Sequence, residues 1–110
     1  SNGATLTGMV ERGSRGKPMP ASGTRVVLVP DSARRLRRDL YKNAIADSDG
    51  KFQLTGIALG NYKLFAWELV EDGAWEDSEF LKIYEAAGKT IRISDNGRES
   101  VNVDAIPPWN

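Results

Sequence analysis

The side chains that most often perform acid–base and nucleophilic chemistry are absent from this sequence. Its 110 residues contain no histidine and no cysteine, which removes the commonest general base, the commonest metal ligand and the thiolate nucleophile. A hydrolytic site would have to combine serine or threonine with lysine or a carboxylate, and the Gly-x-Ser-x-Gly motif does not occur. We therefore predict that the chain is not an enzyme and binds no cofactor or metal.

Acidic side chains offer two weaker alternatives. A pair of carboxylates is the machinery of a glycosidase, and one segment holds six acidic residues: Glu68, Glu71, Asp72, Glu76, Asp77 and Glu79. The stretch Asp47-Ser48-Asp49-Gly50 matches the start of a calcium-binding loop but lacks the later ligands and the final glutamate. We interpret the first group as a solvated loop and the second as a tight turn.

The overall charge points to no nucleic-acid partner and no membrane insertion. The 15 basic and 15 acidic residues cancel, so no general field attracts a polyanion, and no apolar stretch approaches the ~18 residues of a membrane span. Clustered arginines at Arg34-Arg35-Leu36-Arg37-Arg38 offer a phosphate-binding alternative. Because Asp31 and Asp39 flank them, we interpret residues 31–39 as an exposed excursion with at most one helical turn.

Aromatic side chains define the possible ligand or partner surface, which consists of Phe65, Trp67, Trp75, Tyr84 and Trp109. Sugar rings stack on exposed indole faces, so these residues carry the alternative of carbohydrate binding. The interpretation we favour is that the rings close the outer face of a sheet beneath a helix. Trp75 and Trp109 are then the rings expected to remain partly exposed.

Short strands must position these residues. Apolar alternation, β-branched runs and turn residues predict seven strands, at residues 4–11, 24–29, 40–47, 51–55, 61–70, 90–94 and 98–105. Ser48-Asp49-Gly50 predicts a hairpin turn, and one helix is predicted over Trp75 to Ala87, capped by Asp77 or Ser78 and ended by Gly88. The pattern predicts an all-β fold: a seven-stranded antiparallel Greek-key β-sandwich with one short helix in a late connection.

The longest predicted strand, Asn61 to Val70, is apolar on both faces. Tyr62, Leu64 and Ala66 share one face, whereas Phe65, Trp67 and Leu69 share the other. A second layer must cover the outer face, or that face is an interaction patch.

The length of the chain suits one domain. We expect the domain to span residues 4–106, followed by a C-terminal tail over 107–110 that begins with two prolines. Ser1-Asn2-Gly3 resembles a cloning scar.

A resemblance to a known family is carried by four stretches: Gly8 to Val10, Pro18 to Ala21 followed by Val26 to Leu28, Ala46 to Leu54, and Ile57 to Leu64. Together they resemble the carboxypeptidase regulatory-like domain family, over about Ala4 to Ala66. The resemblance implies a prealbumin-like (transthyretin-like) sandwich, related to Cna-B-type surface repeats and starch-binding modules. It also implies a non-catalytic structural or interaction module of a larger secreted or cell-surface bacterial protein, in an extracytoplasmic location. The implied partners are neighbouring domains or another surface protein, with a glycan as the alternative.

Cna-B-like relatives can carry an intramolecular Lys–Asn isopeptide bond. Lys17 and Asn102 are the conceivable pair here. Because Lys17 lies in a glycine-rich loop and no buried acid is obvious, we do not expect this bond.

Overall fold

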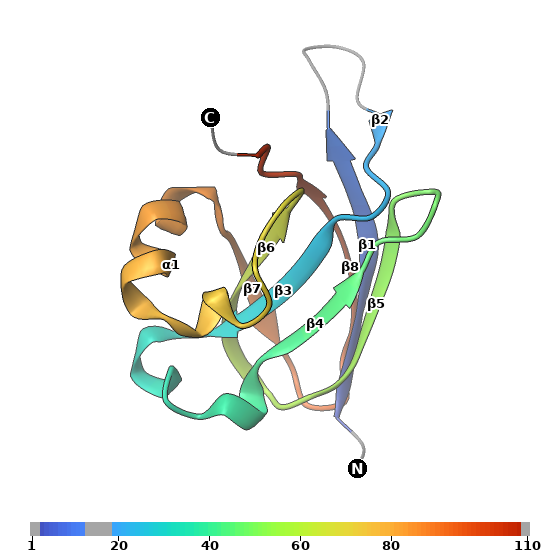
Figure 1. The fold of residues 1–110 in the computed structure, drawn as a ribbon. Helices are drawn as coiled ribbons and strands as arrows, with labels where there is room; N and C mark the ends of the chain where they lie inside the picture. The colour runs from blue at the N-terminus through green and yellow to red at the C-terminus, as the bar shows by residue number, and fades with distance from the viewer. Residues whose placement is uncertain (1–2, 13–18, 109–110) are drawn as a thin grey trace.

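Two β-sheets packed face to face form the body of the protein, and a layer of short helices covers the outer face of one of them (Figure 1). The computed structural model describes residues 3–12 and 19–108. Sheet A contains β1 (Ala4–Arg12), β2 (Met19–Pro20), β5 (Lys51–Ile57) and β8 (Arg98–Asp104). Sheet B contains β4 (Lys42–Ile45), β3 (Arg25–Pro30), β6 (Gly60–Trp67) and β7 (Lys89–Ile93), in that order across the sheet.

Alternating apolar residues build the core between the sheets. Leu6 and Val10 of β1 point inward from sheet A and meet Val26, Leu28 and Leu64 of sheet B, all with no exposed surface. Each such side chain stabilises the fold by about 1.5–3 kcal/mol when it leaves water. Thr7 and Met9, which alternate with them on β1, lie on the outer face, as expected for a sheet that is covered on one side.

The predicted fold class is confirmed, with differences in detail. Eight strands lie within the described residues, because Met19 and Pro20 add a two-residue strand beside the end of β1. One strand pair, β1 with β8, is parallel. The chain leaves β7 of sheet B, turns at Asn96, whose φ is +56, and enters sheet A from the end at which β1 begins. The last strand therefore runs beside the first in the same direction.

The predicted hairpin at Ser48-Asp49-Gly50 is wrong, although the turn itself exists. Asp47 closes it by accepting hydrogen bonds from the backbone N–H groups of Asp49 and Lys51, both at 2.9 Å. The flanking strands separate, because β4 bonds to β3 whereas β5 bonds to β1. The turn is thus a corner between the two sheets.

Residues 105 and 106 tie the sheets together at the opposite end. The Ala105 N–H donates to the Glu11 carbonyl at 2.8 Å, and the Ile106 N–H donates to the Ala66 carbonyl at 2.6 Å. Ile106 also accepts a hydrogen bond from the Glu68 N–H at 2.9 Å. The chain is therefore fixed to both sheets directly after β8.

The helices of the described residues are all short. The basic excursion forms two 3-10 turns, η1 (Ser32–Arg34) and η2 (Arg38–Leu40). The predicted helix over 75–87 is divided into η3 (Ala74–Glu76), α1 (Ser78–Tyr84) and η4 (Glu85–Ala87). Among the described residues, no helix has the length and hydrophobicity needed to cross a membrane.

Alanine substitutions at two glycines test how closely the corner between the two sheets is packed. Gly50 and Gly23 share a φ of +78, but a Cβ on Gly50 would lie 2.7 Å from the Val10 carbonyl oxygen, whereas one on Gly23 would meet nothing within 4 Å. Gly23→Ala should cost about 1–2 kcal/mol for the left-handed backbone alone. Gly50→Ala should cost about 1–3 kcal/mol more, because β1 must move away. Urea denaturation measures both losses, and equal losses would contradict the crowding at Gly50.

Candidate functional site

The outer face of sheet B is the first candidate site, because the sequence places Phe65 and Trp67 there. Val27 and Val29 of β3 lie on the same face and are fully buried. The covering layer is η3, α1 and η4, which Figure 1 shows beside sheet B on the side away from sheet A. Helix α1 begins where the Asp77 side chain accepts a hydrogen bond from the Glu79 N–H at 3.1 Å, which confirms Asp77 as the cap.

The aromatic rings form a second core beneath this layer. Phe65 and Trp67 stack with ring centroids 5.0 Å apart, and Tyr84 meets Trp67 edge-on at 5.5 Å. Phe80 lies 5.5 Å from Trp67 and 5.0 Å from Tyr84. Only 1% of Trp67 and none of Phe65 is exposed. The interpretation of rings closed beneath a helix is therefore confirmed, and no sugar can stack on Trp67 in this arrangement.

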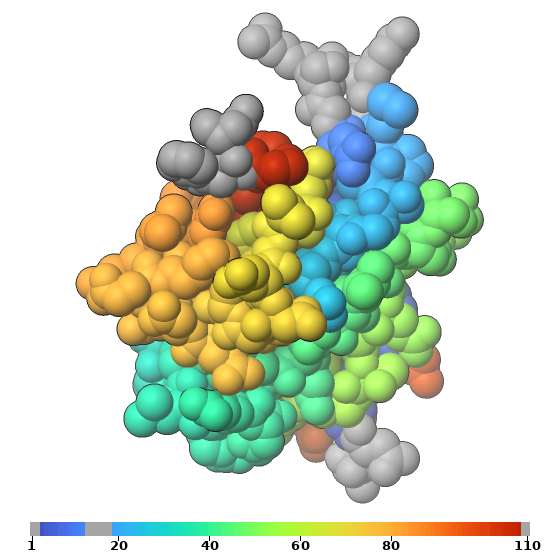
Figure 2. Space-filling view, viewed as in Figure 1, coloured from blue at the N-terminus to red at the C-terminus, as the bar shows by residue number. Residues whose placement is uncertain are grey.

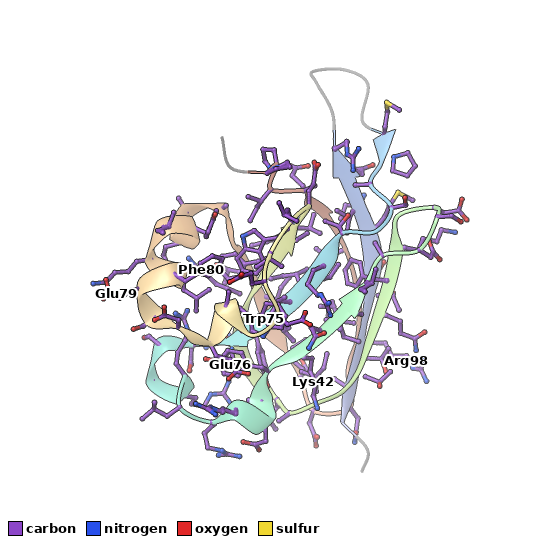
Figure 3. All side chains as sticks on the ribbon, viewed as in Figure 1. Lys42, Trp75, Glu76, Glu79, Phe80 and Arg98 are labelled. Carbon is purple, nitrogen blue, oxygen red and sulfur yellow. The ribbon has the colours of Figure 1, made fainter. Side chains whose placement is uncertain are left out.

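The expected exposure of Trp75 is wrong, and the strand predicted over Asn61 to Val70 ends earlier, at Trp67. Trp75 is 5% exposed, because the guanidinium of Arg25 lies 5.7 Å from its ring centroid while η3 folds it toward the sheet. Arg25 is itself held at 2.9 Å by both Asn43 and Asp72. Leu69 is 75% exposed, because β6 ends at Trp67 and Leu69 no longer follows the sheet. Figure 3 shows Trp75 and Phe80 directed toward sheet B and Glu79 directed away from it.

Packing holds the Trp67 ring in place. Its indole N–H is buried and has no hydrogen-bond acceptor among the described residues. Such an orphan donor costs about 1–3 kcal/mol. The apolar contacts of the second core must outweigh that cost. Trp109, the remaining aromatic candidate, lies outside the described residues.

The basic segment is fastened to the helical layer. Arg35 lies 3.9 Å from Glu85, and Arg38 lies 3.4 Å from Glu76. Figure 2 shows this segment and the helical layer as one continuous surface. The guanidinium of Arg34 covers the Tyr62 ring at 5.2 Å and bonds to Asp31 at 3.2 Å. These arginines already have anionic partners, which weighs against the phosphate-binding alternative.

The acidic residues are dispersed among separate partners. Glu68 pairs with Arg12 at 3.4 Å, and Asp72 pairs with Arg25 at 2.9 Å. Within residues 3–12 and 19–108, no group of three acidic side chains is placed to hold a metal. Lys17, the lysine of the conceivable isopeptide bond with Asn102, lies outside the residues that the structure describes.

The perturbed ionisable groups also have structural partners. Burial raises the pKa of Tyr41 and of Tyr62, and their hydroxyls donate to the carbonyls of Arg35 and Ala58. Backbone hydrogen bonds from Lys51 and Asp49 lower the pKa of Asp47. The shifts in the pKa values of these three groups are thus explained by burial and by hydrogen bonds within the fold.

Sequence reasoning missed a depression of about 660 Å³ that includes the outer face of sheet A and extends to Ala44, Ile45 and Asp47. Thr7 of β1 lies between Gln53 of β5 and Ser100 of β8, and Met9 lies between Lys51 and Asn102. Hydroxyl and amide groups share this depression with the apolar side chains of Met9, Ala44 and Ile45. In each strand alone, these residues are the ordinary solvent-facing positions that alternate with buried ones. Only the pairing of β8 with β1 brings them together.

Comparisons with known proteins show the fold alone. No family model and no curated protein matches the sequence. Several solved structures are similar at low identity, and three of them are described here. A Pseudomonas aeruginosa protein provisionally described as carbohydrate binding is 16% identical with a TM-score of 0.63, over 94% of this chain and 88% of that one. The minor pilin of Streptococcus agalactiae is 12% identical with a TM-score of 0.60, over 99% of this chain and 47% of the pilin.

The third structure is a DUF3823 family protein from Parabacteroides merdae, 18% identical with a TM-score of 0.57, over 94% of this chain and 46% of that one. The chain thus spans about half of the pilin and of the DUF3823 protein. These structures support the β-sandwich. The carboxypeptidase regulatory-like name stays a prediction.

The second core predicts a large penalty for removing its central ring. Trp67→Ala should lower the free energy of unfolding by about 3–5 kcal/mol. Leu69→Ala, two residues along the same chain but exposed, should change it by less than about 0.5 kcal/mol. Chemical denaturation followed by circular dichroism measures both variants. A small loss in Trp67→Ala would show that the layer does not seal the sheet.

The contact of the helical layer with β6 predicts a dependence on acid. The Lys63 ammonium, 2.7 Å from Glu85, lowers the pKa of that carboxyl below its ordinary value of 4.5. Because the folded-state pKa is the lower one, the stabilisation is present above pH 4.5 and is lost as the pH falls through the folded value. The effect is at most about 1 kcal/mol, since the pair is partly exposed. Urea denaturation across this pH range should show a shallower decline in the free energy of unfolding for Glu85→Gln and for Lys63→Gln than for the original chain. A decline as steep as that of the original chain in both variants would contradict the assignment of the acid dependence to this ion pair.

Proposed function

We propose that this chain is a non-catalytic structural module of a larger extracytoplasmic bacterial protein, in which it holds or spaces neighbouring domains. The observation that supports this most is the sealed second core. A binding platform would leave aromatic rings exposed, whereas Phe65, Trp67 and Trp75 are all buried where the helical layer packs against the sandwich.

The charged groups support the same function. The arginines of the basic segment and the carboxylates of the 68–79 segment form ion pairs with each other and with the sheets. Individual exposed pairs stabilise by less than about 1 kcal/mol. Together, however, they connect the excursion, the helical layer and sheet B, which favours one rigid body over a site with movable catalytic groups.

The similar structures support a place in a larger protein. The Streptococcus agalactiae structure is a minor pilin, and this chain spans less than half of it. A sandwich that recurs as part of longer surface proteins is suited to spacing and docking. From the same similarity we infer a location outside the cytoplasm and partners among adjacent domains or other surface proteins.

Carbohydrate binding is the second candidate, at a different place from the one the aromatic residues indicated. The outer face of sheet A presents Thr7, Gln53, Ser100 and Asn102 around an open depression, and hydroxyl and amide groups can bond to sugar hydroxyls. The similarity to a protein provisionally described as carbohydrate binding favours testing this face. The described part of the depression has no ring for stacking except Phe52, which is 6% exposed.

The test compares this chain alone with the complete product of its gene. Docking should raise the melting temperature of the module in the longer protein by about 4 °C or more for each kcal/mol of contact. Differential scanning calorimetry measures this rise. A gene product that consists of this chain alone, or an unchanged melting temperature with no contact seen by hydrogen exchange, would contradict the proposal.

Calorimetric titration of the isolated chain with soluble glycans serves as the control for the second candidate. Binding that Gln53→Ala and Asn102→Ala abolish, with Arg92→Ala on sheet B as the matched variant, would favour carbohydrate binding over a purely structural role.

A further inference from the structure

The first and last strands of this domain are parallel neighbours. β1 and β8 pair in continuous register from Thr5 with Arg98 to Glu11 with Asp104, seven residue pairs in all. β1 begins at one end of the molecule and β8 finishes at the other, so the two ends of the described chain lie at opposite poles (Figure 1). The terminal strands are parallel because the chain enters sheet A from the end at which β1 begins. This arrangement determines the direction in which a stretching force acts on the hydrogen bonds between them.

A force applied through the two ends acts along these strands in opposite directions. The N-terminal attachment pulls β1 toward its start, and the C-terminal attachment pulls β8 toward its finish. The strands must then slide past each other, and every hydrogen bond between them is strained at the same time. Hydrogen bonds that share a force in this way resist it better than bonds that open one after another.

Close contact in the middle of the pair strengthens this resistance. A Cβ on Gly8 would lie 1.9 Å from the Val101 carbonyl oxygen, so only glycine lets the strands approach as they do. The Phe52 ring lies on the same side of Gly8, where a Cβ would be 2.9 Å from it. Sliding of β1 would have to drag this packed region through the core.

Both ends of the strand pair are fixed as well. The Thr5 N–H donates to the Gly97 carbonyl at 2.9 Å, at the end where both strands begin. Beyond β8, Ala105 bonds to Glu11 of sheet A, and Ile106 bonds to Ala66 and Glu68 of sheet B. A pull on the C-terminal side therefore reaches both sheets before β8 can peel away.

We propose that this module resists tension along the chain, with the β1–β8 pair as its mechanical clamp. This inference rests on the proposed function, because only a module tied to neighbours at both ends transmits a pull. It goes beyond that function by naming the element that carries the force and the direction in which it is strong.

Single-molecule force spectroscopy tests the clamp in two pulling geometries at one loading rate. In the first, handles are joined to the two ends of the chain, which shears β1 against β8. In the second, handles are joined to Arg12→Cys and Asp104→Cys, which lie at the same end of the two strands and open the pair from that end. Because the sequence has no cysteine, these thiols are unique. The first geometry should need a several-fold higher force and should fail in one step.

A variant pair locates the resistance. Gly8→Ala should lower the force in the first geometry more than in the second, because it pushes β8 away from β1. Gly23→Ala is the matched control, since its new Cβ would contact nothing within 4 Å. If Gly8→Ala fails to fold, the two geometries of the original chain still decide. Equal unfolding forces in the two pulling geometries would overturn the clamp but would not affect the proposed structural function. A gene product limited to this chain would overturn the proposed function but would not change the measured forces.

Discussion

The structure depends on sheet B being apolar on both faces. Leu64 and Ala66 of β6 point into the sandwich core, whereas Phe65 and Trp67 point outward. A two-layer sandwich leaves such an outer face in water, at a cost of about 25 cal/mol for each Å² of apolar surface. The segment that follows β6 removes this cost by folding back as η3, α1 and η4. The third layer is therefore required by the composition of two neighbouring strands, β6 and β3, the latter of which also places Val27 and Val29 on this face.

The covering layer also determines what the rest of the surface can do. It occupies the aromatic rings that would otherwise offer a stacking platform, and it brings Glu76 and Glu85 to the arginines of the basic excursion. What remains open is the outer face of sheet A, where polar side chains lie beside Met9, and the outer edges of β4, β5, β7 and β8 in the described sheets. The Lys89 ammonium of β7 donates to the Asn102 carbonyl of β8 at 2.7 Å. This bond occupies a backbone acceptor of an edge strand, which is one way of protecting such a strand.

Local sequence patterns predicted the strands and helices well, but they could not predict which distant strands pair. The apolar faces of β6 and the Asp77 cap each follow from neighbouring residues, so the sequence shows them. The run Val26 to Val29 also signals burial on both faces. The separation of β4 from β5 and the parallel approach of β8 to β1 depend on the whole chain path. The burial of Trp75 depends on Arg25, which is distant in sequence, so its exposure was predicted wrongly. The depression on the outer face of sheet A was missed for the same reason.

The most direct test of a sealed second core is acrylamide quenching of tryptophan fluorescence in a Trp109→Phe variant, which leaves Trp67 and Trp75 as the emitters. With 1% and 5% of these side chains exposed, the native protein should be quenched far more slowly than the same chain in denaturant, and its emission should be shifted to the blue. Quenching as fast as in denaturant would mean that the rings are open to solvent and would contradict the account.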